Sequence, residues 1–356
     1  MPVAGAVLRP LGDGLALIGG FTERLEATAS VQWRDPRLGW LPVGCSLLES
    51  RAEPKVVDLD DERLLVIGGW TGRIPGDRTP VESIEVCEPR RPDRRRMTPP
   101  PFGEAGRPLE GLAAIRLDDG RVLVQLDDEL AIYDAAADTW RAAGRIRHAR
   151  RGAAIILVAT GVSSSPRIPI LVGGQESGAP FVEAIHDLDT TPRTSAWRGG
   201  EDAEVPRLRD ASITTIANGR VLIAGGLADG RSTSSTWIVD PANRTFEAGP
   251  LLPLDDGMVG STLVPRGRQV VVLGGESRTA EGPRPIVGLV IDPVGGRVAR
   301  LPASPHPAVR TAVAGVPEGL LAIGGYRFDP SVSIGRRTSV LDQADLLELP
   351  STIVAD

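Results

Sequence analysis

Short apolar runs along the chain end repeatedly in a pair of glycines. Four of the five intervals between neighbouring pairs are close to fifty residues, and the fifth is about twice as long. A degenerate apolar run, Val122 to Asp127, falls inside the long interval at the expected phase. A fixed period of this size is typical of repeat architectures, so the pattern predicts seven repeats. The pairs are Gly19-Gly20, Gly68-Gly69, Gly173-Gly174, Gly225-Gly226, Gly274-Gly275 and Gly324-Gly325.

Each repeat carries signals for four antiparallel strands, and repeat five shows them best. Alternating apolar residues at 211–216 and 220–224 flank the hairpin turn Asn218-Gly219. Two further runs, 236–239 and 245–247, predict the third and fourth strands. The chain is therefore predicted to be all-β and one domain over residues 1–356. The expected repeat boundaries are approximately 3–46, 52–99, 110–145, 151–201, 207–253, 257–304 and 308–350.

Several repeats place an aromatic residue just before an acidic residue and a tryptophan a few positions later. Tyr133, Asp134 and Trp140 form the best match, and Trp33 and Trp40 fit in repeat one. With the glycine pairs, this pattern resembles the kelch repeat. The resemblance implies a seven-bladed β-propeller of four-stranded antiparallel blades, with glycines packed against the next blade and aromatics filling the outer wedges.

The long irregular segments fall mainly between the second and third strands and between repeats. Antiparallel order puts both kinds of connection at the same end of the sheets, so one long-loop face is expected to carry function. Repeat three is an exception, because residues 125–130 predict a tight acidic hairpin without a loop. The ring is expected to close by packing of the first blade on the last, or by a crossover of the first strand or of the tail after Leu349.

Composition narrows the partners. The net charge of −6 gives no bulk attraction to nucleic acid, and no apolar stretch is long enough to span a bilayer. Positive charge comes almost entirely from arginine, and Lys55 is the only lysine. If Met1 is the native start, the first residues lack a signal peptide and predict a cytoplasmic protein. Cys45 and Cys87 are predicted to be two buried thiols, with a disulfide left open.

Metal and cofactor chemistry is not expected. The three histidines, His148, His186 and His306, are each isolated from other metal-type ligands. Copper oxidases of the kelch fold need histidines, tyrosines and a cysteine together, and Tyr133 and Tyr326 are the only tyrosines here. The prediction is therefore no metal, no cofactor and no catalytic residue.

The function predicted from these signals is a monomeric, non-catalytic binding module. It would recognise a protein segment, an acidic small ligand or a carbohydrate on the long-loop face, where arginine suits carboxylates and aromatics suit sugars. The alternative is a carbohydrate-active enzyme or sugar isomerase with its site at the mouth of the axial channel. Charged side chains converging in an enclosed axial pocket would favour the enzyme. The candidate binding residues are Arg73, Arg151, Arg327, Trp70, Tyr326 and Phe102.

Overall fold

The protein is all-β in a computed structural model. Seven main sheets follow one another along the part of the chain that the structure describes. Within the fifth sheet, a 3-10 turn at Ala217–Gly219 joins the first two strands. The described residues are 3–41, 45–73, 76–91, 94–97, 102, 107–161, 166–174, 179–200, 207–301, 308–317, 319–329, 331, 338–341 and 344–347.

The first four main sheets use strands in chain order. The first comprises β1 (Val7–Leu11), β2 (Gly14–Ile18), β3 (Val31–Asp35) and β4 (Gly39–Leu41); the second β5 (Lys55–Asp58), β6 (Leu64–Ile67), β9 (Ile84–Cys87) and β10 (Arg94–Met97). The third comprises β11 (Ala113–Arg116), β12 (Val122–Asp134) and β13 (Thr139–Arg150); the fourth β14 (Ala154–Val158), β15 (Ile168–Val172), β16 (Val182–His186) and β17 (Arg193–Ala196).

The last three main sheets continue this order. The fifth comprises β20 (Ser212–Thr215), β21 (Val221–Ala224), β24 (Thr236–Asp240) and β25 (Thr245–Ala248), with β18 (Arg198–Gly199) added in parallel to β25. The sixth comprises β26 (Thr262–Arg266), β27 (Gln269–Leu273), β30 (Leu289–Asp292) and β31 (Arg297–Arg300); the seventh β32 (Ala312–Val316), β33 (Gly319–Ile323) and β36 (Ala344–Leu347). The strands expected for repeat five are confirmed.

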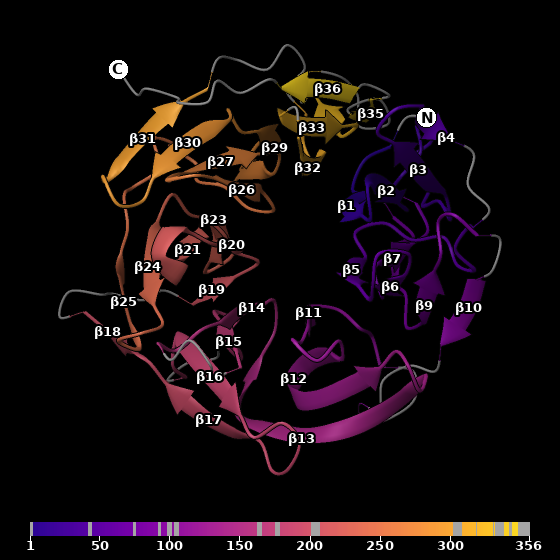
Figure 1. The fold of residues 1–356 in the computed structure, drawn as a ribbon. Coiled ribbons are helices and arrows are strands. Elements are labelled where there is room, and N and C mark those ends of the chain that lie inside the picture. Colours follow the sequence, from indigo (N-terminus) through magenta and orange to yellow (C-terminus); the bar gives the residue numbers. More distant parts are fainter. Residues whose placement is uncertain are drawn as a thin grey trace.

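The main sheets stand around a common centre, with the first strand of each nearest to it (Figure 1). Each of these inner strands contacts the next, and β32 contacts β1. The amide of Gly5 donates to the carbonyl of Arg310 over 3.1 Å, and Val3 and Leu8 share a cluster with Ala314. The first and last sheets therefore pack together, and β1 pairs with β2 of its own sheet. The predicted alternative, a crossover of the tail after Leu349, lies outside the described residues.

The hydrophobic core is divided among the interfaces between sheets. Each cluster of buried apolar residues draws on two neighbouring sheets; for example, Trp33 and Cys87 meet between the first and second, and Phe246 packs with Trp197 between the fourth and fifth. Burial of large aromatics between sheets is the arrangement expected from the outer tryptophans. Each neighbouring sheet covers one face of a given sheet. Every sheet therefore depends on both of its neighbours for its core.

The glycine pairs allow neighbouring sheets to approach closely. Gly173 has a φ of 68° and Gly324 a φ of 63°, both in the left-handed region. A Cβ atom at Gly173 would lie 2.4 Å from the Leu208 carbonyl oxygen, and one at Gly324 would lie 2.0 Å from the Val3 carbonyl oxygen. Both contacts are with the backbone that leads into the next sheet. The expectation that any Cβ would collide there is confirmed.

Two of these glycine turns are each held by a buried arginine. Arg150 donates to the Gly173 carbonyl over 2.6 Å and to the Glu183 carboxylate over 3.0 Å. Arg51 is placed in the same way in the second sheet, where it donates to the Gly68 carbonyl over 3.0 Å and pairs with Glu85. Both arginine side chains are fully buried. Each charge is therefore compensated inside the protein, as a buried ion must be.

The third sheet contains the predicted tight hairpin, although its strand assignment is continuous. β12 extends through residues 125–130, and β13 runs beside it. Arg121, just before β12, and Arg141, opposite Ile132 near its end, both donate to the Asp189 carboxylate. The two ends of β12 therefore lie close together, and the chain reverses at Asp127, which adopts a φ of 53°. Arg107 and Arg151 pair with Asp127, and Arg145 pairs with Glu129. The acidic residues are thus neutralised by arginines from the flanking connections.

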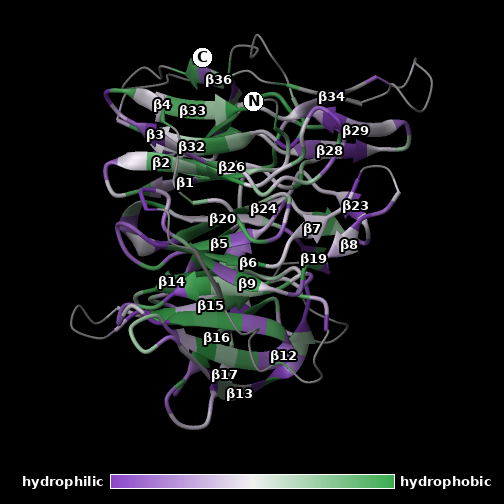
Figure 2. Ribbon diagram, turned by 90° about the vertical axis from the view of Figure 1, so that its right-hand side faces the viewer, coloured by the Kyte–Doolittle hydropathy of each residue, from purple (hydrophilic) through white to green (hydrophobic). Residues whose placement is uncertain are grey.

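Short extra hairpins gather at one end of the sheets (Figure 2). Four of them begin directly after a glycine pair: β7 (Trp70–Thr71) with β8 (Thr79–Pro80), β22 (Leu227–Ala228) with β23 (Arg231–Ser232) and β19 (Leu208–Arg209), β28 (Glu276–Thr279) with β29 (Gly282–Pro285), and β34 (Tyr326–Phe328) with β35 (Thr338–Val340). This is the end at which each inner strand begins, so the long connections lie around one mouth of the central axis.

Candidate active site

A cavity of about 660 Å³ lies between the inner strands. Residues of β1, β5, β11, β14 and β20 line it, together with the residues that lead into the inner strands. Its volume falls within the range of roughly 300 to 1,000 Å³ that is usual for small-molecule sites. Much of the lining is small, with Gly111, Ala114, Gly152, Ala154 and Ser212. The crowding of inner strands around the axis demands small residues and leaves this space open.

Five charged side chains line the axial cavity. Arg9 comes from β1, Lys55 and Asp58 from the two ends of β5, Arg116 from β11, and Asp210 from the segment before β20. Three cationic and two anionic groups from four sheets thus meet within one cavity. Convergence of charge in a cavity is a common feature of catalytic sites.

Lys55 is exposed, and it lines this cavity. The surrounding protein lowers the pKa of its ammonium group below the ordinary value of 10.5, because burial disfavours the charged form. The positive charge of Arg9 lowers the pKa further, while Asp210 opposes the shift. Arg9 is held against the same strand, because its guanidinium donates to the Val56 carbonyl over 2.7 Å.

The two acids are shifted in the opposite direction. Burial raises the pKa of Asp58 above its ordinary value of 3.8, against the lowering effect of Arg9 and Arg116. Burial likewise raises the pKa of Asp210, with Arg209 and Lys55 opposing. An amine with a lowered pKa and acids with raised pKa values are closer together in proton affinity than they are in water, which favours proton exchange among them.

Two polar atoms of the cavity-lining side chains lack an internal partner. The Arg9 Nε and Asp58 Oδ1 atoms are buried, and neither has a hydrogen-bond partner among the described residues. Buried donors and acceptors are nearly always satisfied in folded proteins, so these two atoms are exceptions. Both atoms are closed off from the cavity, so a ligand reaches Arg9 and Asp58 only through their other polar atoms.

One backbone position recurs around the mouth of the cavity. Two residues before each inner strand, the chain takes a φ between 53° and 70°. These positions, called here the left-handed ring, are Gly5, Glu53, Gly111, Gly152, Asp210, Gly260 and Arg310. Amides and carbonyls of the ring link neighbouring sheets; for example, Asp210 N donates to Gly152 O over 2.8 Å. The non-glycine members are charged, and a side chain held in this region is strained by about 1 to 3 kcal/mol.

The charged members of the left-handed ring have specific surroundings. A Cβ atom at Gly152 would lie 2.7 Å from the Asp210 Oδ1 atom, so the carboxylate occupies space that only glycine leaves free. Arg310 pairs with Glu53 and, over 3.3 Å, with Glu276. Burial raises the pKa of nearby Tyr326 to about 12, with Arg310 opposing. Strain and charge thus coincide at the mouth, a combination found at functional sites.

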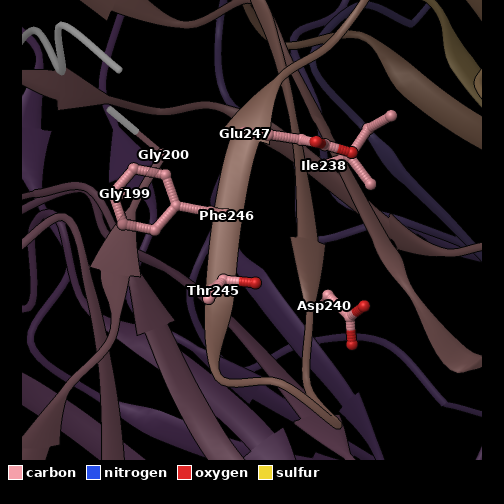
Figure 3. A pocket seen from close by; sticks show the side chains of 7 residues that line it. All are labelled: Gly199, Gly200, Ile238, Asp240, Thr245, Phe246 and Glu247. Atoms are coloured by element: carbon pink, nitrogen blue, oxygen red, sulfur yellow. The ribbon is translucent and has the colours of Figure 1, made fainter. Parts of the chain in front are cut away.

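A second hollow, of about 250 Å³, lies on the outer edge of the fifth sheet (Figure 3). On β25, Phe246 points toward Gly199 and Gly200, while Glu247 lies on the other side of the strand. Asp240 there accepts hydrogen bonds from the Ala242 and Asn243 amides and so closes its own turn. The outer hollow is small, and the Asp240 carboxylate in it already has hydrogen-bond donors. The axial cavity is therefore the better candidate.

The candidate binding residues predicted from the sequence lie outside the axial cavity. Arg73 and Arg327 are exposed, and Arg151 is engaged with Asp127 over 2.6 Å. Trp70 is half-buried, with the Arg78 guanidinium 4.2 Å from the centre of its ring, and Tyr326 is half-buried beside Arg310. The structure does not bring them together in one pocket, and as binding residues they stay predictions.

Phe102 requires a correction. It was expected as an exposed aromatic on the binding face, but only 4% of its surface is exposed. Its ring belongs to the hydrophobic cluster between the second and third sheets, where Leu65, Val124 and Tyr133 surround it. Three prolines precede Phe102 in the sequence, and they do not indicate which way its ring points. Packing in the hydrophobic core determines the orientation of the ring.

Sequence reasoning missed the residues of the axial cavity. Lys55 was noticed as the only lysine, but its place in the fold was not assigned. The repeat register contained the missing signal: Glu53, Asp210 and Arg310 occupy positions at which the other repeats have glycine. Charged residues at such positions are costly, and alignment of the seven repeats would have marked them.

A comparison with solved structures finds a fungal alcohol oxidase of the AA5 family in complex with copper. The TM-score is 0.67, with 12% identity over 95% of this chain and 73% of the oxidase. At this identity the likeness shows a shared all-β fold. No family model and no curated protein matches the chain. The resemblance to kelch repeats therefore stays a prediction.

The described residues do not fit a copper ion like the one held by that oxidase. No group of three or more His, Cys, Asp or Glu side chains gathers in the described part of the chain. The residues lining the axial cavity include no histidine, cysteine or tyrosine. His186 instead contacts Ser195 over 2.9 Å, and the Tyr133 hydroxyl donates to Asp138 over 3.0 Å. His148 lies 3.5 Å from the Glu183 carboxylate, and His306 lies outside the described residues.

The likeness to an enzyme corrects the prediction of a non-catalytic binding module. The criterion set by the sequence is met in part, because charged side chains line a half-open axial cavity rather than a broad aromatic face. The predicted alternative, an enzyme with its site on the axis, fits these findings better. No helix in the described residues is long and apolar enough to cross a membrane.

Proposed function

We propose that the protein is an enzyme that isomerises a sugar or sugar acid by proton transfer in the axial cavity. The observation that carries this proposal is the meeting of Arg9, Lys55, Asp58, Arg116 and Asp210 in one cavity of about 660 Å³. A broad binding surface does not need acids and a base whose pKa values are shifted toward each other.

The reaction is a proton shift at a carbon next to a carbonyl group. Asp210, ionised, accepts the proton from that carbon, and Asp58, protonated, donates one in return. The raised pKa of Asp58 keeps its protonated form to a higher pH than in an exposed carboxyl group, and the raised pKa of Asp210 makes its ionised form a stronger base. Arg9 and Arg116 orient the substrate through its hydroxyl or carboxylate oxygens.

The architecture we infer for this enzyme is a seven-bladed β-propeller. Seven main sheets in chain order, inner strands in contact around the axis, and packing of the first sheet on the last support it. Three described sheets depart from the four-stranded blade of the prediction, with three assigned strands in the third and the seventh and a fifth strand added to the fifth. In a propeller, each blade brings one inner strand to the axis, which explains how four sheets supply the charged groups.

The test follows proton exchange on candidate substrates. The protein is incubated in D2O with a panel of aldoses, ketoses and sugar acids, and proton NMR records the loss of the signal from the carbon beside the carbonyl. The Asp210→Asn variant is expected to slow exchange by roughly 10²- to 10⁴-fold, the usual contribution of a general base. Glu281→Gln, which alters an exposed surface carboxylate, serves as the control.

Enzyme-dependent exchange with at least one sugar, lost in Asp210→Asn and kept in Glu281→Gln, supports the proposal. Absence of exchange across the panel, or equal exchange rates in wild type and Asp210→Asn, overturns it.

A further inference from the structure

Lys55 has a position that proton transfer alone does not explain. It is the only lysine in a chain that otherwise uses arginine, and it lines the axial cavity at the first position of β5. Arginine would supply positive charge equally well there, as it does at Arg9 and Arg116. A lysine differs because its nitrogen can become a nucleophile when it loses its proton.

We propose that Lys55 forms a covalent imine with the carbonyl carbon of a substrate that also carries a carboxylate, a 2-oxo acid of sugar type. This inference rests on the proposed function and assigns a substrate class to the same cavity.

The surroundings of Lys55 favour its neutral, nucleophilic amine. Val57 and Ile156 contribute apolar walls to the cavity, and the small side chain of Ala114 leaves room beside them. Arg9 is held on the neighbouring strand by its hydrogen bond to the Val56 carbonyl. A nearby cation is one of the means by which proteins activate a lysine for attack on carbonyl groups. The lowered pKa of Lys55 agrees with this geometry.

The two arginines of the cavity define the second group of the substrate. Arg9 lines the cavity, and its Nη2 atom donates to the Val56 carbonyl over 2.7 Å. Arg116 forms no hydrogen bond or ion pair with the described residues, although it lines the same cavity. A carboxylate satisfies two guanidinium groups better than a hydroxyl does, because both of its oxygens accept charged hydrogen bonds. A carbonyl next to a carboxylate places the reacting carbon beside this anchor.

The covalent step needs no oxidant or further co-reactant. The neutral amine of Lys55 attacks the carbonyl carbon, the carbon–oxygen double bond breaks, and one water molecule leaves as the carbon–nitrogen double bond forms. The imine nitrogen takes up a proton from solvent and then withdraws electrons from the adjacent carbon, so that Asp210 removes the proton of that carbon and an enamine forms. Asp58 gives a proton to the same carbon, and water hydrolyses the imine, which frees the amine of Lys55 and returns the nitrogen-bound proton to solvent. Asp210 then releases its proton to solvent, and Asp58 takes one up.

Borohydride trapping tests this assignment directly. The full-length protein is incubated with pyruvate, the smallest 2-oxo acid, and sodium borohydride is added to reduce any imine to a stable secondary amine. Intact-mass measurement and peptide mapping then locate the adduct. The expected result is one adduct on the peptide containing Lys55, with a yield at neutral pH at least about tenfold higher for pyruvate than for neutral dihydroxyacetone, because of the charged anchor.

Two variants control the experiment. Lys55→Arg keeps the positive charge and removes the nucleophile, so its adduct is expected to disappear. The double variant Lys55→Arg with Arg193→Lys moves the single lysine to a side chain that is 77% exposed in its surface ion pair. That lysine has ordinary surroundings and is expected to trap at least about tenfold less than Lys55 under the same conditions.

Adduct at Lys55 in the wild type, absent from Lys55→Arg and at least about tenfold lower in the double variant, supports the imine. A wild-type protein that gives no adduct, that reacts only at its terminal amine, or that traps no better than the double variant overturns it. Equal yields with pyruvate and dihydroxyacetone overturn the carboxylate requirement. The outcomes separate the two proposals: sugar exchange without an adduct refutes the imine alone, and an adduct without exchange on any sugar refutes the isomerase alone.

Discussion

Removal of the Glu183 carboxylate is expected to destabilise the protein strongly, because it strands a charge inside the fold. Glu183 is 2% exposed and Arg150 fully buried, and the two are joined by a hydrogen bond of 3.0 Å. In the Glu183→Ala variant, Arg150 still donates to the Gly173 and Pro180 carbonyls over 2.6 Å each, so it cannot leave easily for solvent. Breaking a buried pair from one side costs about 3 to 5 kcal/mol.

The reverse substitution gives a second measure of the same site. Arg150→Met leaves the Glu183 carboxylate buried without its partner and also removes the donor from two backbone carbonyls. Each unsatisfied buried carbonyl adds about 1 to 3 kcal/mol, so Arg150→Met is expected to cost more than Glu183→Ala. The order of the two variants follows from the hydrogen bonds of Arg150, and an exposed ion pair would not produce it.

Urea unfolding followed by tryptophan fluorescence and circular dichroism measures these differences. The matched control is Arg193→Ala, which breaks a 2.6 Å ion pair in the same sheet between side chains that are 77% and 41% exposed. That exposed pair is expected to contribute about 1 kcal/mol or less. If Glu183→Ala costs no more than Arg193→Ala, the argument that buried pairing fastens the glycine turn is wrong.

Three further outcomes follow from the structure. Gly324→Ala places a Cβ against the backbone leading into the first sheet and should cost about 3 kcal/mol or more in unfolding free energy, whereas Gly296→Ala, with a φ of 66° and open space around it, should cost only about 1 to 2; equal losses would exclude a steric cause. Asp210→Asn should raise the melting temperature at pH 7, because a carboxyl group whose pKa is raised on folding stabilises the protein only at low pH and loses that contribution as pH rises through its folded pKa. The gain in melting temperature over wild type should vanish below pH 3.8. A gain that is constant with pH would refute this linkage. Cys45 and Cys87 are buried, and their sulfur atoms lie 2.8 Å apart. Both thiols should resist iodoacetamide in the native protein and react after unfolding in urea, because the contact with Cys45 and burial raise the pKa of Cys87. Rapid labelling of the native protein would contradict this prediction.

The regular part of the fold was predictable from the sequence because it depends on local backbone chemistry. Gly173 and Gly324 mark places where a Cβ would collide, and such positions leave a trace in the chain whatever the rest of the repeat does. The tight turn of the third sheet was also predictable, from the acidic run at residues 125–130, where Asp127 takes a φ of 53°. The pairing of Asp127 with Arg150 at the end of β13 was not predictable, because it depends on the path of the connection to the fourth sheet.

The candidate site was harder to predict because its residues are far apart in sequence. Arg9, Asp58 and Asp210 come from separate repeats, and only the ring arrangement brings them to one cavity. Arginine-rich loops drew attention to the outer face, where Arg151 proves to be neutralised by Asp127. Burial and pairing decide whether a charge is available, and neither follows from composition.

The left-handed ring also bears on how such a protein acquires a new activity. Each repeat presents one residue at the mouth of the cavity from an equivalent backbone position, and glycine at that position is a neutral default. Exchange of one glycine for a charged residue, at the cost of local strain, adds one group at a defined angle around the axis and leaves the other repeats unchanged. Glu53, Asp210 and Arg310 are three such additions, so an asymmetric substrate is served by a scaffold made of seven near-identical parts, each of which evolution can vary independently.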